Sequence, residues 1–83
     1  MKTIVRAAII RDGKIYEGRR HYDIIKDMVY NHGCKPPIRQ NEQGFVDNDG
    51  NFVNRIEAAT IALENGQVEK LTAPPLLYSE DLY

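Results

Sequence analysis

The chain has 83 residues, of which 42% are hydrophobic and 28% charged, with a formal net charge of −1, so we expect residues 1–83 to form a single small domain. The near-neutral charge argues against bulk binding to duplex nucleic acid, which requires a clearly basic domain. Every apolar run falls short of the roughly 18 residues that a membrane-spanning helix needs, and a cytoplasmic protein is expected.

Residues 3–17 predict a β-hairpin. Residues 3–11 are rich in β-branched side chains, and Asp12-Gly13 separates them from a second short run at residues 14–17. An Asp-Gly pair in this position favours a type I′ turn, because both of its residues need a positive φ. The expected cross-strand pairs are Ile10 with Ile15, Ile9 with Tyr16 and Ala8 with Glu17. The residues expected to share one face with Ile15, Glu17 and Arg19 are Ile4, Arg6, Ala8 and Ile10.

Residues 21–31 predict an amphipathic helix, which Gly33 ends and Pro36-Pro37 keeps from resuming. Its apolar residues recur at helical spacing. The expected buried stripe consists of Tyr22, Ile25, Met28 and Val29, widened by Ile24. Residues 34–43 then predict a polar loop.

A second hairpin follows, with Asp47-Asn48-Asp49-Gly50 as its turn. The expected pairs are Val46 with Phe52 and Phe45 with Val53. A second helix begins at Asn54, where Asn54 and Glu57 fit a capping box, and it ends at Gly66. Its expected apolar side contains Ile56, Ala59, Ile61, Ala62 and Leu63.

The remaining residues predict one short strand at 67–73 and an apolar segment, residues 74–83, that docks on the domain or on a second subunit. The docking residues are expected to be Leu77, Leu82 and Tyr83. Ser79 is expected to cap a terminal turn. The order of elements predicts an α+β fold, with two hairpins each followed by a helix and an antiparallel sheet covered on one face.

Cations stand at both predicted junctions between a strand and a helix. Arg19, Arg20 and His21 precede the first helix, and Arg55 opens the second. The start of a helix attracts anions, and the arginine fork suits phosphate or carboxylate. We therefore expect an anion or nucleotide site in which these arginines contact phosphate and His21 donates a hydrogen bond.

Two further residues are candidates for the same site. Arg6 lies inside the first strand, and Tyr16 or another aromatic ring offers a stacking face for a base. The alternative is that the arginines are neutralised within the fold. The acidic residues expected to do so are Glu17 and Asp23 near the first junction, and Asp47, Glu57 and Glu80 near the second.

No residue set predicts catalysis, a metal or another cofactor. Only two histidines and one cysteine are present, which is too few soft ligands for a zinc site. Cys34 follows His32 and Gly33, but no third orienting group accompanies it. The turn at residues 47–50 lacks the carboxylates of a calcium loop. We therefore expect a binding protein that is not an enzyme.

Five segments resemble those of a group of small accessory proteins of tailed bacteriophages. In chain order they are G-K-I-Y-E-G-R-R-H at residues 13–21, Q-G-F-V at 43–46, G-N-F-V-N-R-I-E-A at 50–58, G-Q at 66–67 and S-E-D-L-Y at 79–83. The resemblance implies a phage protein that acts in the host cytoplasm by binding, either by sequestering a nucleotide immune signal or by blocking a host protein.

Two functions are therefore expected as alternatives. The first is capture of a small anionic ligand, a nucleotide or cyclic nucleotide, in a site completed across a homo-oligomer because one small subunit offers little pocket volume. The second is inhibition of a host protein, or an adaptor role, through the apolar C-terminal segment and the exposed tyrosines.

Overall fold

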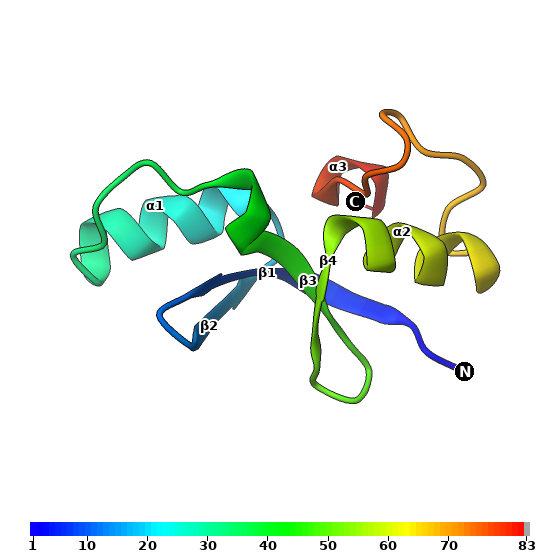
Figure 1. Cartoon of the computed structure of the whole chain (residues 1–83), viewed down its shortest axis with the longest axis horizontal. Helices are drawn as coiled ribbons and strands as arrows, with labels where there is room; N and C mark the ends of the chain where they lie inside the picture. Colours follow the sequence, from blue (N-terminus) through cyan, green and yellow to red (C-terminus); the bar gives the residue numbers. More distant parts are fainter. Residues whose placement is uncertain (83) are drawn as a thin grey trace.

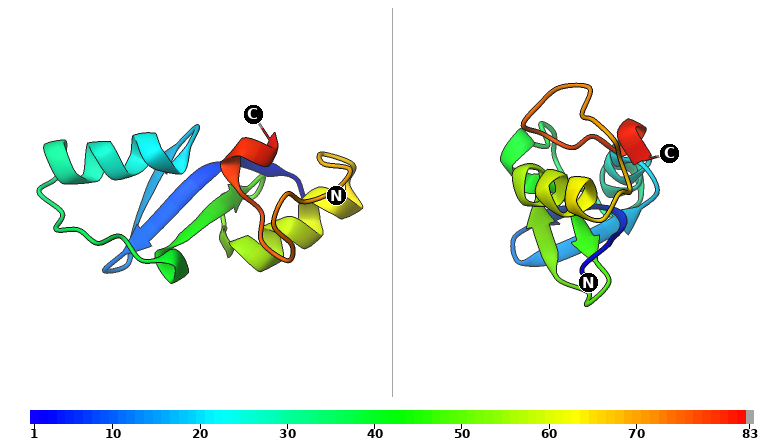
Figure 2. Two further views of the ribbon diagram at one scale, coloured as in Figure 1. Left: turned by 90° about the horizontal axis from the view of Figure 1, so that it is seen from above. Right: turned by 90° about the vertical axis from the view of Figure 1, so that its right-hand side faces the viewer.

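The computed structural model describes residues 1–82, which form a four-stranded antiparallel sheet with strand order β2-β1-β3-β4. The elements are β1 (Ile4–Arg11), β2 (Lys14–Gly18), α1 (His21–Asn31), the 3-10 turn η1 (Gln40–Glu42), β3 (Gln43–Asp47), β4 (Phe52–Asn54), α2 (Arg55–Glu64) and α3 (Ser79–Leu82). Helices α1 and α2 lie on the same side of the sheet (Figures 1 and 2). The predicted α+β fold with a sheet covered on one face is confirmed.

Both hairpins have the predicted registers. In the first, Ile10 pairs with Ile15, and Asp12 and Gly13 have φ values of 52° and 76°, as a type I′ turn requires. In the second, Val46 pairs with Phe52, and Gly50 has a φ of 82°. Local turn chemistry therefore sets both hairpins.

Helix α2 begins with the predicted capping box. The Asn54 side chain accepts from the Glu57 N–H at 2.8 Å, and the Glu57 carboxylate accepts from the Asn54 N–H at 3.2 Å. Two N–H groups that have no partner inside the helix are thereby satisfied. The cap fixes the point at which β4 becomes α2, directly before Arg55.

The core lies between the sheet and the two helices, but the predicted helix faces are wrong in part. Helix α1 buries His21, Ile24 and Met28, whereas Tyr22 is 73% exposed. Helix α2 buries Arg55 and three alanines, whereas Ile56 and Leu63 are exposed. The sheet contributes Ala7, Ile9, Phe45 and Val53 to this core.

Two further expectations are corrected. A β-bulge between Ile4 and Arg6 shifts the alternation, so Ile4 joins the buried core instead of sharing a face with Arg6. Residues 67–73 form no strand. The only β-pairing in this part of the described chain is an isolated bridge between Ala73 and Leu76.

The C-terminal segment packs on the same domain. The Leu77 side chain is fully buried and Leu82 packs against the core. The Leu77 N–H donates to the Arg55 carbonyl at 3.1 Å, so this segment lies beside the start of α2. Tyr83, the third predicted docking residue, lies outside the described residues.

Candidate functional site

Arg55, the first residue of α2, is a buried cation. Its side chain is held by two hydrogen bonds, from Nη1 to the Leu77 carbonyl at 2.8 Å and from Nη2 to Gln43 Oε1 at 2.7 Å. The guanidinium carbon lies 4.5 Å from the centre of the Tyr78 ring. Only 4% of the residue is exposed, and this burial lowers the pKa of the guanidinium, which remains charged because its ordinary pKa is so high.

No carboxylate among residues 1–82 lies within ion-pair distance of Arg55. Two of its three expected acidic partners are engaged elsewhere: Glu57 in the helix cap, and Asp47 in the turn at residues 47–51. The charge of the third, Glu80, acts on the guanidinium and partly offsets the lowering of its pKa, but forms no ion pair with it. The Nε atom of Arg55 is buried without a hydrogen-bond partner. The positive charge is therefore not neutralised by direct contact within the described fold.

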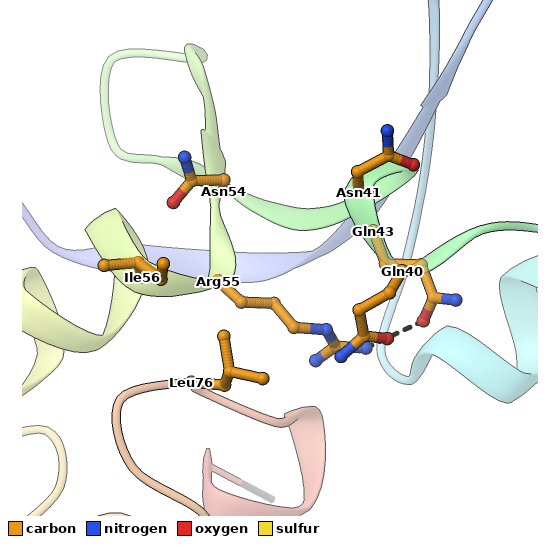
Figure 3. Close-up of a pocket in the computed structure, with 7 residues that line it drawn as sticks. All are labelled: Gln40, Asn41, Gln43, Asn54, Arg55, Ile56 and Leu76. Atoms are coloured by element: carbon orange, nitrogen blue, oxygen red, sulfur yellow. Dashed lines mark hydrogen bonds between the residues drawn. The ribbon is translucent and has the colours of Figure 1, made fainter.

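A pocket of about 360 Å³ opens beside Arg55 (Figure 3). The strand–helix junction forms one wall, the turn before β3 a second, and the C-terminal segment a third. Its lining residues are Gln40, Asn41, Gln43, Asn54, Arg55, Ile56 and Leu76. The pocket thus combines four neutral amides, one cation and two apolar side chains.

His21, the first residue of α1, is buried as well. Its Nε2 lies 2.7 Å from the Gly44 carbonyl, and its Nδ1 lies 3.3 Å from Ser79 Oγ. Burial, followed by the charge of Arg55, lowers its pKa to about 4. A neutral imidazole that donates from Nε2 to Gly44 and accepts the Ser79 hydroxyl at Nδ1 satisfies both contacts.

Ser79 has a different role from the expected cap of its own turn. Its Oγ lies 3.5 Å from the backbone nitrogen of His21, where the Arg20 side chain provides no cap. The C-terminal segment thus contacts the starts of both longer helices, through Leu77 at α2 and Ser79 at α1.

The other predicted ligand residues lie in different places. Arg6 and Arg19 line a separate surface hollow, and Arg6 lies 3.6 Å from Glu17. Arg20 is half-buried at the start of α1. Tyr16 lines a third hollow near the first hairpin turn, where Lys14 and His32 contact its ring. Of the six predicted residues, only Arg55 lines the pocket.

Sequence reasoning missed the amides of the pocket. The polar run that contains Gln40, Asn41 and Gln43 predicts only an ordinary loop, although three amides in four residues directly before a strand are a usable signal. The loop takes its position from Arg11, which binds Glu42 through Nε at 2.8 Å and also donates to the Lys35 and Pro37 carbonyls. These contacts join Arg11 to residues 24 to 31 positions further along the chain, so local sequence patterns do not reveal them.

Residues 1–82 contain neither a membrane-spanning helix nor a cluster of metal ligands. No helix there is both long enough and apolar enough to cross a bilayer, and no three of the histidine, cysteine, aspartate and glutamate side chains gather around a point where a metal ion could sit.

Comparison with known proteins gives one family. The profile of the phage T4 y16D protein family matches residues 3–83. The chain belongs to the phage T4 y16D protein family. No curated protein and no solved structure matches it. Membership in the y16D family confirms the broad part of the resemblance, a small phage protein.

Proposed function

We propose that this phage protein binds a small anionic ligand, a nucleotide or cyclic nucleotide, in the Arg55 pocket and does not convert it. In this proposal the protein acts in the host cytoplasm and sequesters a nucleotide signal of host defence. The observation that carries the proposal is the buried charge of Arg55, which no carboxylate of the described chain contacts.

Burying this charge has an energetic cost. A buried cation without a direct ion pair is destabilising, and an anion in contact with it reduces the cost. The positive end of the α2 dipole lies at the same place and adds to the attraction for an anion. A phosphate in the pocket would therefore face two sources of positive potential.

The remaining lining suits the base of a nucleotide. Amide side chains both donate and accept hydrogen bonds, as the edge of a base requires. Ile56 and Leu76 provide apolar surface against which a ring can lie. The volume of about 360 Å³ falls within the usual range for small-molecule sites.

Calorimetric titration of the purified protein with a panel of mononucleotides and cyclic nucleotides tests the proposal. We expect saturable binding, and we expect Asn41→Ala to weaken it about tenfold through loss of one hydrogen bond. Asn51→Ala, which removes an exposed amide from the distant hairpin turn, is the matched control. Binding of no nucleotide would refute the proposal, and recovery of a converted ligand would refute its non-enzymatic part.

Inhibition of a host protein is the second candidate, and the observation that favours it is the exposure of two tyrosines. Tyr22 and Tyr30 are 73% and 78% exposed on the outer side of α1, and exposed tyrosines are typical of protein interfaces. In this case Tyr22→Ser with Tyr30→Ser would abolish capture of the host partner and leave nucleotide titrations unchanged. Because Leu77 is buried, the C-terminal segment is less suited to this role than the tyrosines.

A further inference from the structure

We infer that a second copy of this chain docks on the face of the sheet opposite the helices, so that the protein is a two-fold dimer through this surface. The inference is independent of the nucleotide pocket, which lies at the start of α2. The open face, as we name this surface, consists of Arg6, Ala8, Ile10, Ile15, Glu17, Gly44, Val46 and Phe52.

The composition of the open face follows from the registers. Ala7, Ile9 and Phe45 point into the core, so their strand neighbours point to the other side. Most of those neighbours are apolar. Ile15 is 37% exposed, Ile10 and Phe52 are half-buried, and Ala8, Gly44 and Val46 are already buried in the single chain. Figure 1 shows that α1 and α2 lie on one side of the sheet, and by their registers these apolar residues face the other side.

Phe52 flattens the middle of this surface. A Cβ atom on Gly44 would lie 2.6 Å from Cζ of Phe52, so the ring lies directly over the glycine backbone. Ala8 pairs with Gly44 on the neighbouring strand and is also small. Large side chains lying flat over small ones give an even surface, which suits close approach of another sheet face.

The charges of the open face favour a second copy as the partner. Arg6 Nε and Glu17 Oε1 lie 3.6 Å apart, and both side chains are about half exposed. A two-fold axis through the open face brings Arg6 of each copy toward Glu17 of the other. Two symmetric pairs of opposite charge then form between the copies. A nucleic acid or a uniformly acidic protein would instead meet Glu17 with a like charge, which disfavours such partners.

The size of the chain gives a separate physical reason. A domain of this length buries a limited fraction of its surface, and oligomerisation is a usual source of additional burial. Within the open face, Ile10, Ile15 and Phe52 retain exposed apolar surface, and a second copy would bury it without any change in the fold.

Sedimentation analysis over a dilution series tests the inference. We expect wild-type protein to sediment at twice the 9.5 kDa chain mass at high concentration. Ile15→Glu should raise the dimer dissociation constant at least about tenfold, because it places a carboxylate in the apolar part of the interface. Leu63→Glu, which alters a similarly exposed residue on α2 (41%), should leave the dimer intact, and circular dichroism should show that both variants are folded.

Two charge variants test the reciprocal pairing. Arg6→Glu alone and Glu17→Arg alone should each self-associate more weakly than wild type, because like charges then meet across the axis. An equimolar mixture of the two variants should form a heterodimer. In the mixed dimer the two introduced charges are opposite in sign and face each other, and the unaltered Glu17 of one chain faces the unaltered Arg6 of the other.

Three results would overturn the inference. The first is a wild-type protein that is monomeric at every concentration. The second is a dimer that Ile15→Glu and Leu63→Glu affect equally. The third is a mixture of the two charge variants that associates no better than either variant alone.

Discussion

The imidazole of His21 shows how burial decides the role of a residue that a sequence presents as a ligand donor. Both ring nitrogens face groups of the protein itself, the Gly44 carbonyl and the Ser79 hydroxyl. Arg55 and Glu80 supply the nearby charges, and burial together with Arg55 holds the pKa of the ring at about 4. The ring is therefore neutral at neutral pH and joins α1, β3 and the C-terminal segment.

The lowered pKa predicts a loss of stability in mild acid. The pKa of His21 is about 4 in the folded chain and about 6.5 in the unfolded chain, so the unfolded chain takes up the proton first as pH falls. The neutral His21 therefore contributes fully to the unfolding free energy above pH 6.5. This contribution falls by about 3 kcal/mol as the pH is lowered to 4.

Urea unfolding at several pH values measures this decline. His21→Gln keeps a donor for the Gly44 carbonyl but does not titrate, so its stability should vary much less between pH 6.5 and pH 4. A slope that survives His21→Gln would show that another group causes it.

At the scale of the elements, Gly44 shows why β3 and β4 lie so close together. A Cβ at this position would overlap the Val53 carbonyl oxygen and would stand 2.6 Å from Phe52 Cζ. Backbone cannot move aside as a flexible side chain can. The position therefore requires glycine although its φ is unexceptional.

Gly44→Ala should lower the unfolding free energy by about 3 kcal/mol. Gly18→Ala is the comparison, because there the closest atom is Cγ1 of the buried Ile24 at 2.8 Å, a side chain and not backbone, and we expect a smaller loss of about 2 kcal/mol. Thermal or urea unfolding compares the two. Equal losses would mean that the strand pair adjusts more easily than this packing suggests.

The sequence allowed the turns and caps to be predicted because their chemistry is local. Asp12-Gly13, Asn54 and Gly50 satisfy backbone requirements within four residues of themselves. The helix faces were harder, since two stripes of α1 follow helical spacing, one with Tyr22, Ile25 and Val29 and one with Ile24 and Met28. Only the position of the sheet decides which stripe is more deeply buried. The bulge after Ile4 has no comparable local signal.

The candidate site could be predicted only in its charged part. Arg55 stands out because a cation at a helix start is unfavourable unless something compensates it. Its amide neighbours depend on the contact between Arg11 and Glu42, which spans much of the chain. The six predicted residues do not line one pocket within a single chain, because the strand order places Tyr16 on the edge strand β2 and Arg55 at the end of the opposite edge strand β4.

At the scale of the whole molecule, Leu77 closes the core from the far end of the chain. It is fully buried and lies against the start of α2 through its backbone contacts with Arg55. Leu77→Ala should therefore lower the unfolding free energy by about 3 kcal/mol and Tm by roughly 15 °C. Leu63→Ala, at an exposed position of α2, should change Tm little, and similar effects of the two changes would argue against this role.

The attachment of the C-terminal segment at two helix starts has a consequence for hydrogen exchange. Because Leu77 occupies the core and its amide bonds to Arg55, the segment cannot open without uncovering the sheet. The Leu77 amide should then exchange with solvent as slowly as the core amides of Ile9 and Phe45, because all three become accessible only on global unfolding. The exposed amides of Lys70 and Thr72 should exchange much sooner, so that protection returns near the end of the chain instead of fading toward it.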